Sequence, residues 1–192
     1  MSSVIHAAIK LSNERFLLHV WPAVKHMVGG GDIVPVEAVT NPRFAEDMLD
    51  KFGSIDLWHI LPEKGKMRGM ASRVQKLRAG IFQTFTLRDN GPRSEYERLA
   101  TSIDGHFLHP ELFCQAYLMP GDAVDALAYA AMVRVRDLIK FFQTNSGWRS
   151  DKNTEDGKAF RIAAVSDLQN CGVEVKQTKL SPGVLVLNGR IS

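Results

Sequence analysis

Three strand-like runs follow one another in the middle of the chain, at residues 54–60, 69–75 and 81–88. The third run is rich in β-branched and aromatic side chains, which are typical of strands. A turn-forming segment at residues 62–66 separates the first two runs, and residues 76–80 separate the second from the third. The alternation of side chains in these runs predicts three consecutive strands in one sheet.

Helices and further strands are expected on both sides of these runs. Capping residues and apolar spacing predict helices at residues 13–27, 41–52, 94–103 and 123–142, and strands at residues 33–39, 112–119, 160–165 and 173–177. This order predicts an α/β fold of the mixed α+β kind, in which helices flank both faces of a central mixed sheet. The triplet at residues 29–31 follows a predicted helix, and we interpret it as a helix stop.

Composition limits the class of protein. The 192 residues are 45% hydrophobic and 23% charged, which predicts one folded domain over residues 1–192, with residues 1–40 as an N-terminal extension. No stretch has the roughly 20 apolar residues that a membrane span needs, and the N-terminus does not read as a signal peptide. Two cysteines without a C-x-x-C spacing favour a reduced chain, so we expect a cytoplasmic location. The net charge of +3 permits a nucleic-acid partner without requiring one.

Polar side chains of the three central runs fall on one face of the expected sheet, because alternate residues of a strand share a face. That polar face collects Asp56, Arg73, Gln75, Thr86 and Arg88. The opposite, apolar face collects Leu57, Val74, Phe85 and Leu87. A polar face of a sheet is often simply solvated. Arginines outnumber acids on this one, however, and this favours a site for phosphate.

The order of carboxylates around Asp56 resembles the core of the PD-(D/E)xK nuclease superfamily. Glu46 lies in the predicted helix at 41–52, and Asp56 follows ten residues later in the strand that begins Gly-Ser-Ile-Asp at residues 53–56. The resemblance extends over residues 44–117 and implies a restriction-endonuclease-like core within residues 41–192. It also implies that Asp56 and Glu46 bind Mg²⁺, or Mn²⁺ in its place, for hydrolysis of a phosphodiester.

The chain departs from this family in the second strand, where the acid-x-Lys motif is absent. Gln75 or Arg73 would have to take the part of the lysine, and Glu37 in the preceding strand would have to supply the second metal-binding carboxylate. Arg73 is a poor general base because its pKa lies above about 12. The resemblance therefore implies a nuclease with an altered catalytic motif, whose cleavage is slow, conditional or lost.

Further arginines extend the expected nucleic-acid contact beyond the catalytic residues. Arg93 and Arg98 flank the start of the helix at 94–103, and we expect them to bind nucleic acid together with Arg73 and Arg88. A surface pair between Glu95 and Arg98 is the competing interpretation.

Two functions remain open. The first is a Mg²⁺-dependent DNA endonuclease. The second is a catalytically inactive phage or mobile-element accessory protein that binds nucleic acid or a protein partner. DNA is the expected partner, no membrane contact is expected, and a homodimer is compatible with the sequence. No P-loop is present and no G-x-G-x-x-G motif follows a strand, which argues against a nucleotide-cofactor enzyme.

Overall fold

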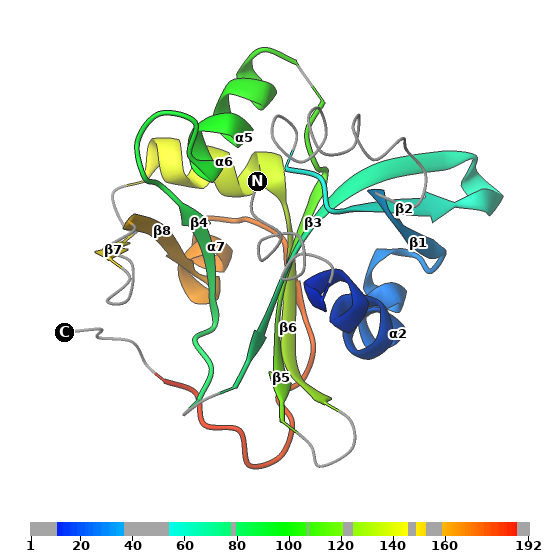
Figure 1. Cartoon of the computed structure of the whole chain (residues 1–192). Helices are drawn as coiled ribbons and strands as arrows, with labels where there is room; N and C mark the ends of the chain where they lie inside the picture. Colours follow the sequence, from blue (N-terminus) through cyan, green and yellow to red (C-terminus); the bar gives the residue numbers. More distant parts are fainter. Residues whose placement is uncertain are drawn as a thin grey trace.

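Two β-sheets and several helices make up the part of the chain that the computed structural model describes, namely residues 11–36, 54–77, 80–106, 108–120, 125–145, 149–152 and 159–187 (Figure 1). The larger sheet has the strand order β1-β2-β3-β5-β6-β9, and the smaller one has the order β4-β8-β7. In the larger sheet β3 and β5 run parallel, while the other neighbouring strands are antiparallel. The larger sheet is therefore mixed, as the sequence predicts.

The bounds of the elements are as follows. The larger sheet consists of β1 (Asp32–Pro35), β2 (Leu57–Leu61), β3 (Lys66–Lys76), β5 (Leu112–Met119), β6 (Ala126–Arg134) and β9 (Val175–Gln177). The smaller sheet consists of β4 (Thr84–Arg88), β7 (Arg149–Lys152) and β8 (Ala159–Ala164). The helical elements are the π-helical η1 (Phe16–Val20), α2 (Trp21–Val24), the 3-10 helices η2 (Lys25–Val28) and η4 (Pro62–Lys64), α5 (Glu95–Asp104), α6 (Val135–Thr144) and α7 (Val165–Asn170).

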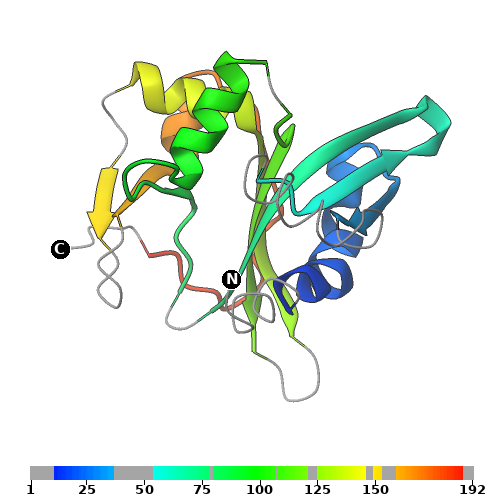
Figure 2. The ribbon, with the colours of Figure 1, turned by 45° about the horizontal axis from the view of Figure 1, so that its top comes forward.

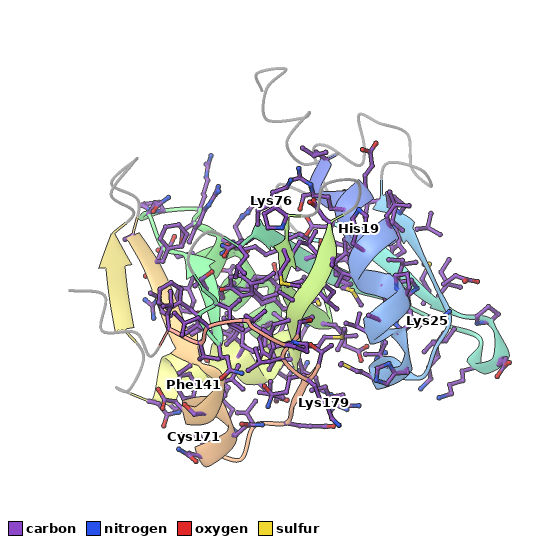
Figure 3. All side chains as sticks on the ribbon, turned by 90° about the horizontal axis from the view of Figure 1, so that it is seen from below. His19, Lys25, Lys76, Phe141, Cys171 and Lys179 are labelled. Atoms are coloured by element: carbon purple, nitrogen blue, oxygen red, sulfur yellow. The ribbon has the colours of Figure 1, made fainter. Side chains whose placement is uncertain are left out.

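Each face of the larger sheet is covered by a different layer (Figure 2). On one face the N-terminal helical segment contributes Phe16, Val20 and Val24, all fully buried, to a core with the larger sheet. On the other face the smaller sheet packs together with α5, α6 and α7. Figure 3 shows the side chains that fill these cores, whereas Lys25 and Lys179 lie on the outside. Helices on both faces of a central mixed sheet confirm the predicted fold class.

The strand β5 shows how the two cores share the sheet. Phe113 and Tyr117 point into the core beneath the smaller sheet, whereas Cys114, Ala116 and Leu118 point toward the N-terminal helical segment. A strand buried on both faces has no polar alternation, so it appears in the sequence as one continuous apolar run. The predicted strand at residues 112–119 is confirmed.

The prediction that the three central runs share one sheet is wrong. β2 and β3 pair with each other, but β4 pairs with β8 in the smaller sheet, with Phe85 opposite Ala163. β5 takes the place next to β3, with Leu112 beside Met70. A position covered on both faces buries more apolar surface of a strand that is apolar throughout than of a strand with alternating polarity, and this burial stabilises the fold. The expected apolar face is also divided, because Leu57 and Val74 pack beneath the N-terminal helical segment. Phe85 and Leu87 pack in the other core.

The prediction of one helix over residues 123–142 is also wrong. The chain forms β6 as far as Arg134, and only then α6. Residues 128–133 are each at most 2% exposed, because β6 pairs with β5 and is covered on both faces. A continuous apolar run fits a buried strand as well as a buried helix, and the pairing with β5 decides between them.

The N-terminal helical segment is less regular than the predicted helix at residues 13–27. Pro22 has no backbone N–H and cannot continue the α-helical ladder. Just before it, the backbone N–H of Trp21 donates to the carbonyl of Phe16, five residues back, and this contact forms a π-helical turn.

Three further predicted elements are confirmed, namely the helix at residues 94–103 and the strands at residues 160–165 and 173–177. Ser94 caps α5 by accepting a hydrogen bond from the backbone N–H of Glu97, and β8 and β9 lie within a residue or two of their predicted places. β1 ends at Pro35, earlier than predicted. The predicted helix at 41–52 lies outside the described residues. Among the residues that the structure describes, helices long and apolar enough to cross a membrane are absent.

Candidate functional site

Asp56 lies at the entrance to β2, where its side chain extends the pairing with β3. Its Oδ2 accepts a hydrogen bond from the backbone N–H of Ser72 at 2.7 Å, and its own N–H donates to the carbonyl of Met70 at 3.0 Å. The carboxylate thus occupies the place of a backbone carbonyl in the ladder. Glu37 and Glu46 lie outside the described residues, so the metal site that joins them to Asp56 stays a prediction. Within the described residues no group of three or more potential metal ligands occurs.

Arg73 lies between the two sheets. Its Nη1 donates to the carbonyl and the hydroxyl of Thr86, both at 2.6 Å, and its Nη2 donates to Oε2 of Glu95 at 2.7 Å. Gln115, which is buried, accepts a hydrogen bond from the backbone N–H of Thr86. Arg73 and Thr86 therefore do lie together, as the strand parity predicts, but the contact joins two sheets. Gln75, two residues further along β3, is exposed.

The other predicted arginines lie around the start of α5. Arg88 is exposed at the end of β4, and its backbone N–H donates to Oε2 of Glu95 at 3.0 Å. Arg93 is exposed in the preceding turn, and Arg98 is half-buried on α5. Glu95 makes its ion pair with Arg73, so the surface pair expected between Glu95 and Arg98 is not the principal contact of this carboxylate.

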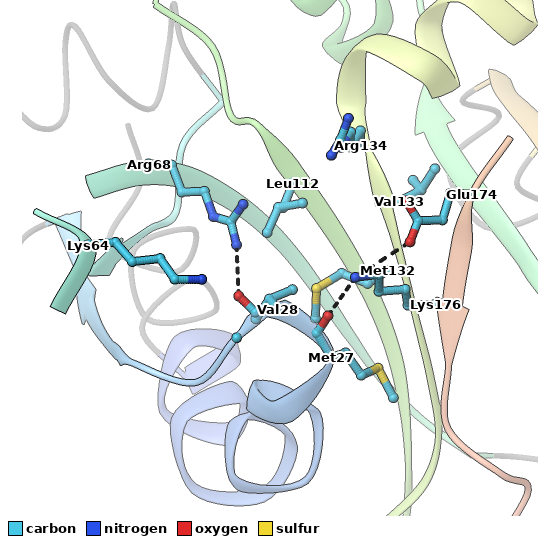
Figure 4. A pocket seen from close by; sticks show the side chains of 11 residues that line it. Met27, Val28, Lys64, Arg68, Leu112, Met132, Val133, Arg134, Glu174 and Lys176 are labelled. Carbon is cyan, nitrogen blue, oxygen red and sulfur yellow. Dashed lines mark hydrogen bonds and ion pairs between the residues drawn. The ribbon is translucent and has the colours of Figure 1, made fainter. Parts of the chain in front are cut away.

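A pocket of about 290 Å³ lies elsewhere, on the face of the larger sheet that carries the N-terminal helical segment (Figure 4). The strand registers bring its residues together, since Leu112 lies opposite Arg134 and Met132 lies opposite Lys176. Residues opposite each other on neighbouring strands share a face. Met70 of β3 pairs with Leu112. Arg68 lies two residues before Met70 and therefore on the same face of the sheet, because alternate residues of a strand share a face. The last turn of η2 forms the remaining wall.

Four cationic side chains from four elements line this pocket, hereafter the cationic pocket. They are Lys64 of η4, Arg68 of β3, Arg134 of β6 and Lys176 of β9. Glu174 is the one carboxylate in the lining. Glu174 pairs with Lys176 at 3.5 Å, and Glu111, which does not line the pocket, pairs with Arg68 at 2.9 Å. Four positive charges against these two negative charges leave a net positive potential that attracts anions.

Two of the four cations make hydrogen bonds that give them a structural role in the folded chain. Arg68 donates to the carbonyl of Val28 at 3.2 Å, and Lys176 donates to the carbonyl of Met27 at 2.8 Å. These carbonyls end η2, where cations are favourable. The side chains of Lys64 and Arg134, in contrast, make no hydrogen bond or ion pair within the described part of the chain. They are exposed and can take a ligand without breaking an existing contact.

His59 of β2 lies behind the cationic pocket and is fully buried. Its Nε2 donates to the carbonyl of Gly30 at 2.7 Å, and its Nδ1 accepts a hydrogen bond from Nε of Arg68 at 3.0 Å. These two contacts require the neutral ring with its proton on Nε2. Burial lowers the pKa of His59 below its usual value. The neighbouring Arg68 also lowers the pKa, while the bond to Gly30 and the charge of Glu111 act in the opposite direction.

The glycine triplet holds the carbonyl of Gly30 against His59. Gly29, Gly30 and Gly31 all have positive φ, at 90°, 78° and 86°, so the chain turns sharply between η2 and β1. A Cβ at Gly31 would overlap the carbonyl oxygen of Ile60. The triplet is a helix stop, as the sequence predicts, and it also fixes the back of the cationic pocket.

The sequence interpretation missed this pocket. Lys64 and Arg68 are close in the sequence, but Arg134 and Lys176 are far from them and from each other, and only the sheet registers bring all four cations together. The available signal was His59, a polar residue on the apolar side of a strand, together with the glycine triplet that precedes the next strand.

No protein-family model, curated protein or solved structure matches the chain. Its function is therefore argued from its own residues.

Proposed function

We propose that the chain is a nucleic-acid-binding protein that holds a backbone phosphate in the cationic pocket. One observation carries the proposal: four cations from separate elements surround a single pocket, and two of them, Lys64 and Arg134, are not engaged by any described residue. Arg68 and Lys176 already pair with Glu111 and Glu174, whereas the positive charges of Lys64 and Arg134 are left for an anion in the pocket to offset. A phosphate is the anion for which arginine and lysine together are best suited.

The floor of the pocket supports a phosphate ester over a free inorganic ion. Leu112 and Met132 are almost completely buried and belong to the apolar core of this face. An apolar floor favours a ligand that presents a sugar or base beside its charged group. Nucleic acid offers both in every nucleotide, and DNA is the form that the nuclease resemblance favours.

Cleavage is a separate proposal. A restriction-endonuclease-like core with Mg²⁺ at Asp56, Glu37 and Glu46 would make the chain a DNA endonuclease, with Arg73 or Gln75 near the attacking water. Binding in the cationic pocket requires none of these residues. The inactive accessory protein, from a phage or mobile element, is therefore equally compatible with the proposal.

The binding proposal is tested by fluorescence anisotropy with fluorescein-labelled single-stranded DNA, duplex DNA and RNA. We expect the double variant Lys64→Ala/Arg134→Ala to weaken binding by about a hundredfold, since each of the two lost contacts to a charged group costs roughly 1.5 kcal/mol. The matched control is Lys140→Ala/Lys179→Ala, which removes the same charge from exposed positions outside the pocket. Equal weakening by both pairs, or no binding by the wild type, would overturn the proposal.

A further inference from the structure

We infer that Arg68 is the residue that grips two oxygens of the phosphate, and that His59 is the positioning residue that sets the orientation of its guanidinium. The inference deepens the proposed function and rests on it. It assigns a role to a buried histidine that does not line the pocket but contacts Arg68, which does.

Arg68 is held at three points. Its Nε donates to Nδ1 of His59 at 3.0 Å, its Nη1 donates to Oε1 of Glu111 at 2.9 Å, and its Nη2 donates to the carbonyl of Val28 at 3.2 Å. A guanidinium has five N–H groups in one plane. Two of them, one on each terminal nitrogen, remain for a ligand, and they lie on a side chain that the structure already orients. Binding then costs less ordering of the side chain than it would for a mobile arginine.

His59 is the residue that makes this orientation specific. Nδ1 must act as an acceptor, because Nε2 already donates to the carbonyl of Gly30 and the ring of Trp21 lies edge-on to the imidazole at 5.0 Å between centroids. The imidazole therefore cannot turn to offer Arg68 a different atom. Glu111 and Val28 alone would leave Nε without an acceptor and the plane of the guanidinium free to rotate.

A simpler interpretation is that His59 only anchors the glycine turn through Gly30. Two substitutions separate these roles, because each keeps one of the two hydrogen bonds. His59→Asn places an amide oxygen near the position of Nδ1 and keeps an acceptor for Arg68. His59→Gln places an amide nitrogen near the position of Nε2 and keeps a donor for Gly30.

The experiment measures binding of fluorescein-labelled duplex DNA together with the melting temperature of each variant. If His59 positions Arg68, we expect His59→Gln to weaken binding by about tenfold and His59→Asn to weaken it by about threefold or less. Arg68→Lys, which keeps the charge without the planar fork, should weaken binding as much as His59→Gln. Weaker binding by His59→Asn than by His59→Gln, or equal binding by both, would overturn the inference. Neither result would contradict phosphate binding in the cationic pocket.

A second measurement needs no ligand. Nitrogen-15 NMR of the free wild-type protein should show His59 with Nδ1 unprotonated and an Arg68 Nε–H that exchanges slowly with water. The slow Nε–H signal should persist in His59→Asn and disappear in His59→Gln. A rapidly exchanging Nε–H in the wild type would overturn the positioning role directly. Failure of wild-type binding to DNA, in contrast, would remove the proposed function and with it the role of Arg68 toward phosphate.

Discussion

Arg73 and Glu95 form an ion pair across the contact between the larger sheet and α5, with 2.7 Å between Nη2 and Oε2. Their side chains are 19% and 15% exposed. The same carboxylate oxygen accepts a hydrogen bond from the backbone N–H of Arg88, and the same guanidinium holds Thr86. The pair therefore ties β3, β4 and α5 together.

Arg73→Ala should destabilise the fold, because it leaves Glu95 without its cation and removes both bonds to Thr86. We expect the free energy of unfolding to fall by about 2–4 kcal/mol. Chemical denaturation measures it. Arg88→Ala is the control, since its exposed side chain can be removed while the backbone contact to Glu95 remains, and it should change stability by about 0.5 kcal/mol or less. Equal effects of the two substitutions would contradict the structural role of Arg73.

Gly31→Ala should destabilise the fold more than Gly30→Ala. Both residues have positive φ, so both substitutions carry a backbone strain of about 1 kcal/mol. A Cβ at Gly31 also overlaps the carbonyl oxygen of Ile60, whereas a Cβ at Gly30 meets no atom within 4 Å. We expect an additional loss of about 1–3 kcal/mol at Gly31, measured by thermal or chemical unfolding. Similar losses at both positions would show that β1 and β2 separate readily.

Stability should fall as the pH drops below the usual histidine pKa of 6.5, because the pKa of His59 is lowered in the folded state. The unfolded chain then takes up the proton first, so the stability contributed by neutral His59 is complete above 6.5 and is lost as the pH falls toward the folded pKa. The charged groups facing the ring are Arg68 and Glu111. Chemical denaturation on both sides of pH 6.5 should show this slope in the wild type and a reduced slope in His59→Asn. The same dependence of stability on pH in the wild type and in His59→Asn would show that other titratable groups cause it.

Binding to nucleic acid should become less dependent on salt when a cation of the pocket is removed. Each phosphate contact contributes about 0.7 to 0.9 to the slope of log K against log salt concentration. Arg134→Ala should reduce the magnitude of this slope by the contribution of about one phosphate contact. Arg88→Ala tests the alternative arginine surface in the same assay. A reduced slope for Arg88→Ala with none for Arg134→Ala would move the phosphate from the cationic pocket to the surface around α5.

The nuclease resemblance predicts that Mg²⁺ or Mn²⁺ binds at Asp56. Asp56→Asn is a suitable variant, because the amide oxygen can still accept the hydrogen bond from Ser72. Isothermal titration calorimetry should then show a heat of metal binding in the wild type that Asp56→Asn loses. A nuclease assay with Mn²⁺ on single-stranded, duplex and branched substrates completes the test. Cleavage that survives Asp56→Asn would contradict the assignment, and absence of both heat and cleavage would favour the binding protein.

Local signals in the sequence determined several elements of the fold correctly. Ser94 caps α5 because its hydroxyl reaches a backbone N–H only three residues away. The glycine triplet ends the N-terminal helical segment because it adopts backbone conformations that other residues avoid. β5 was identified because a run buried on both faces is apolar throughout. In each case the information lies within a few residues.

Tertiary structure alone decided which strands are neighbours, and with them the candidate site. The place beside β3 went to β5 instead of β4, and pairing with β5 made residues 126–134 a strand instead of a helix. The cationic pocket depends on the same registers, since Arg68, Arg134 and Lys176 meet only because β3, β5, β6 and β9 lie in that order. Strand neighbours are chosen by the burial of apolar surface across the whole chain, and this competition between distant segments leaves no local pattern around the residues that it brings together.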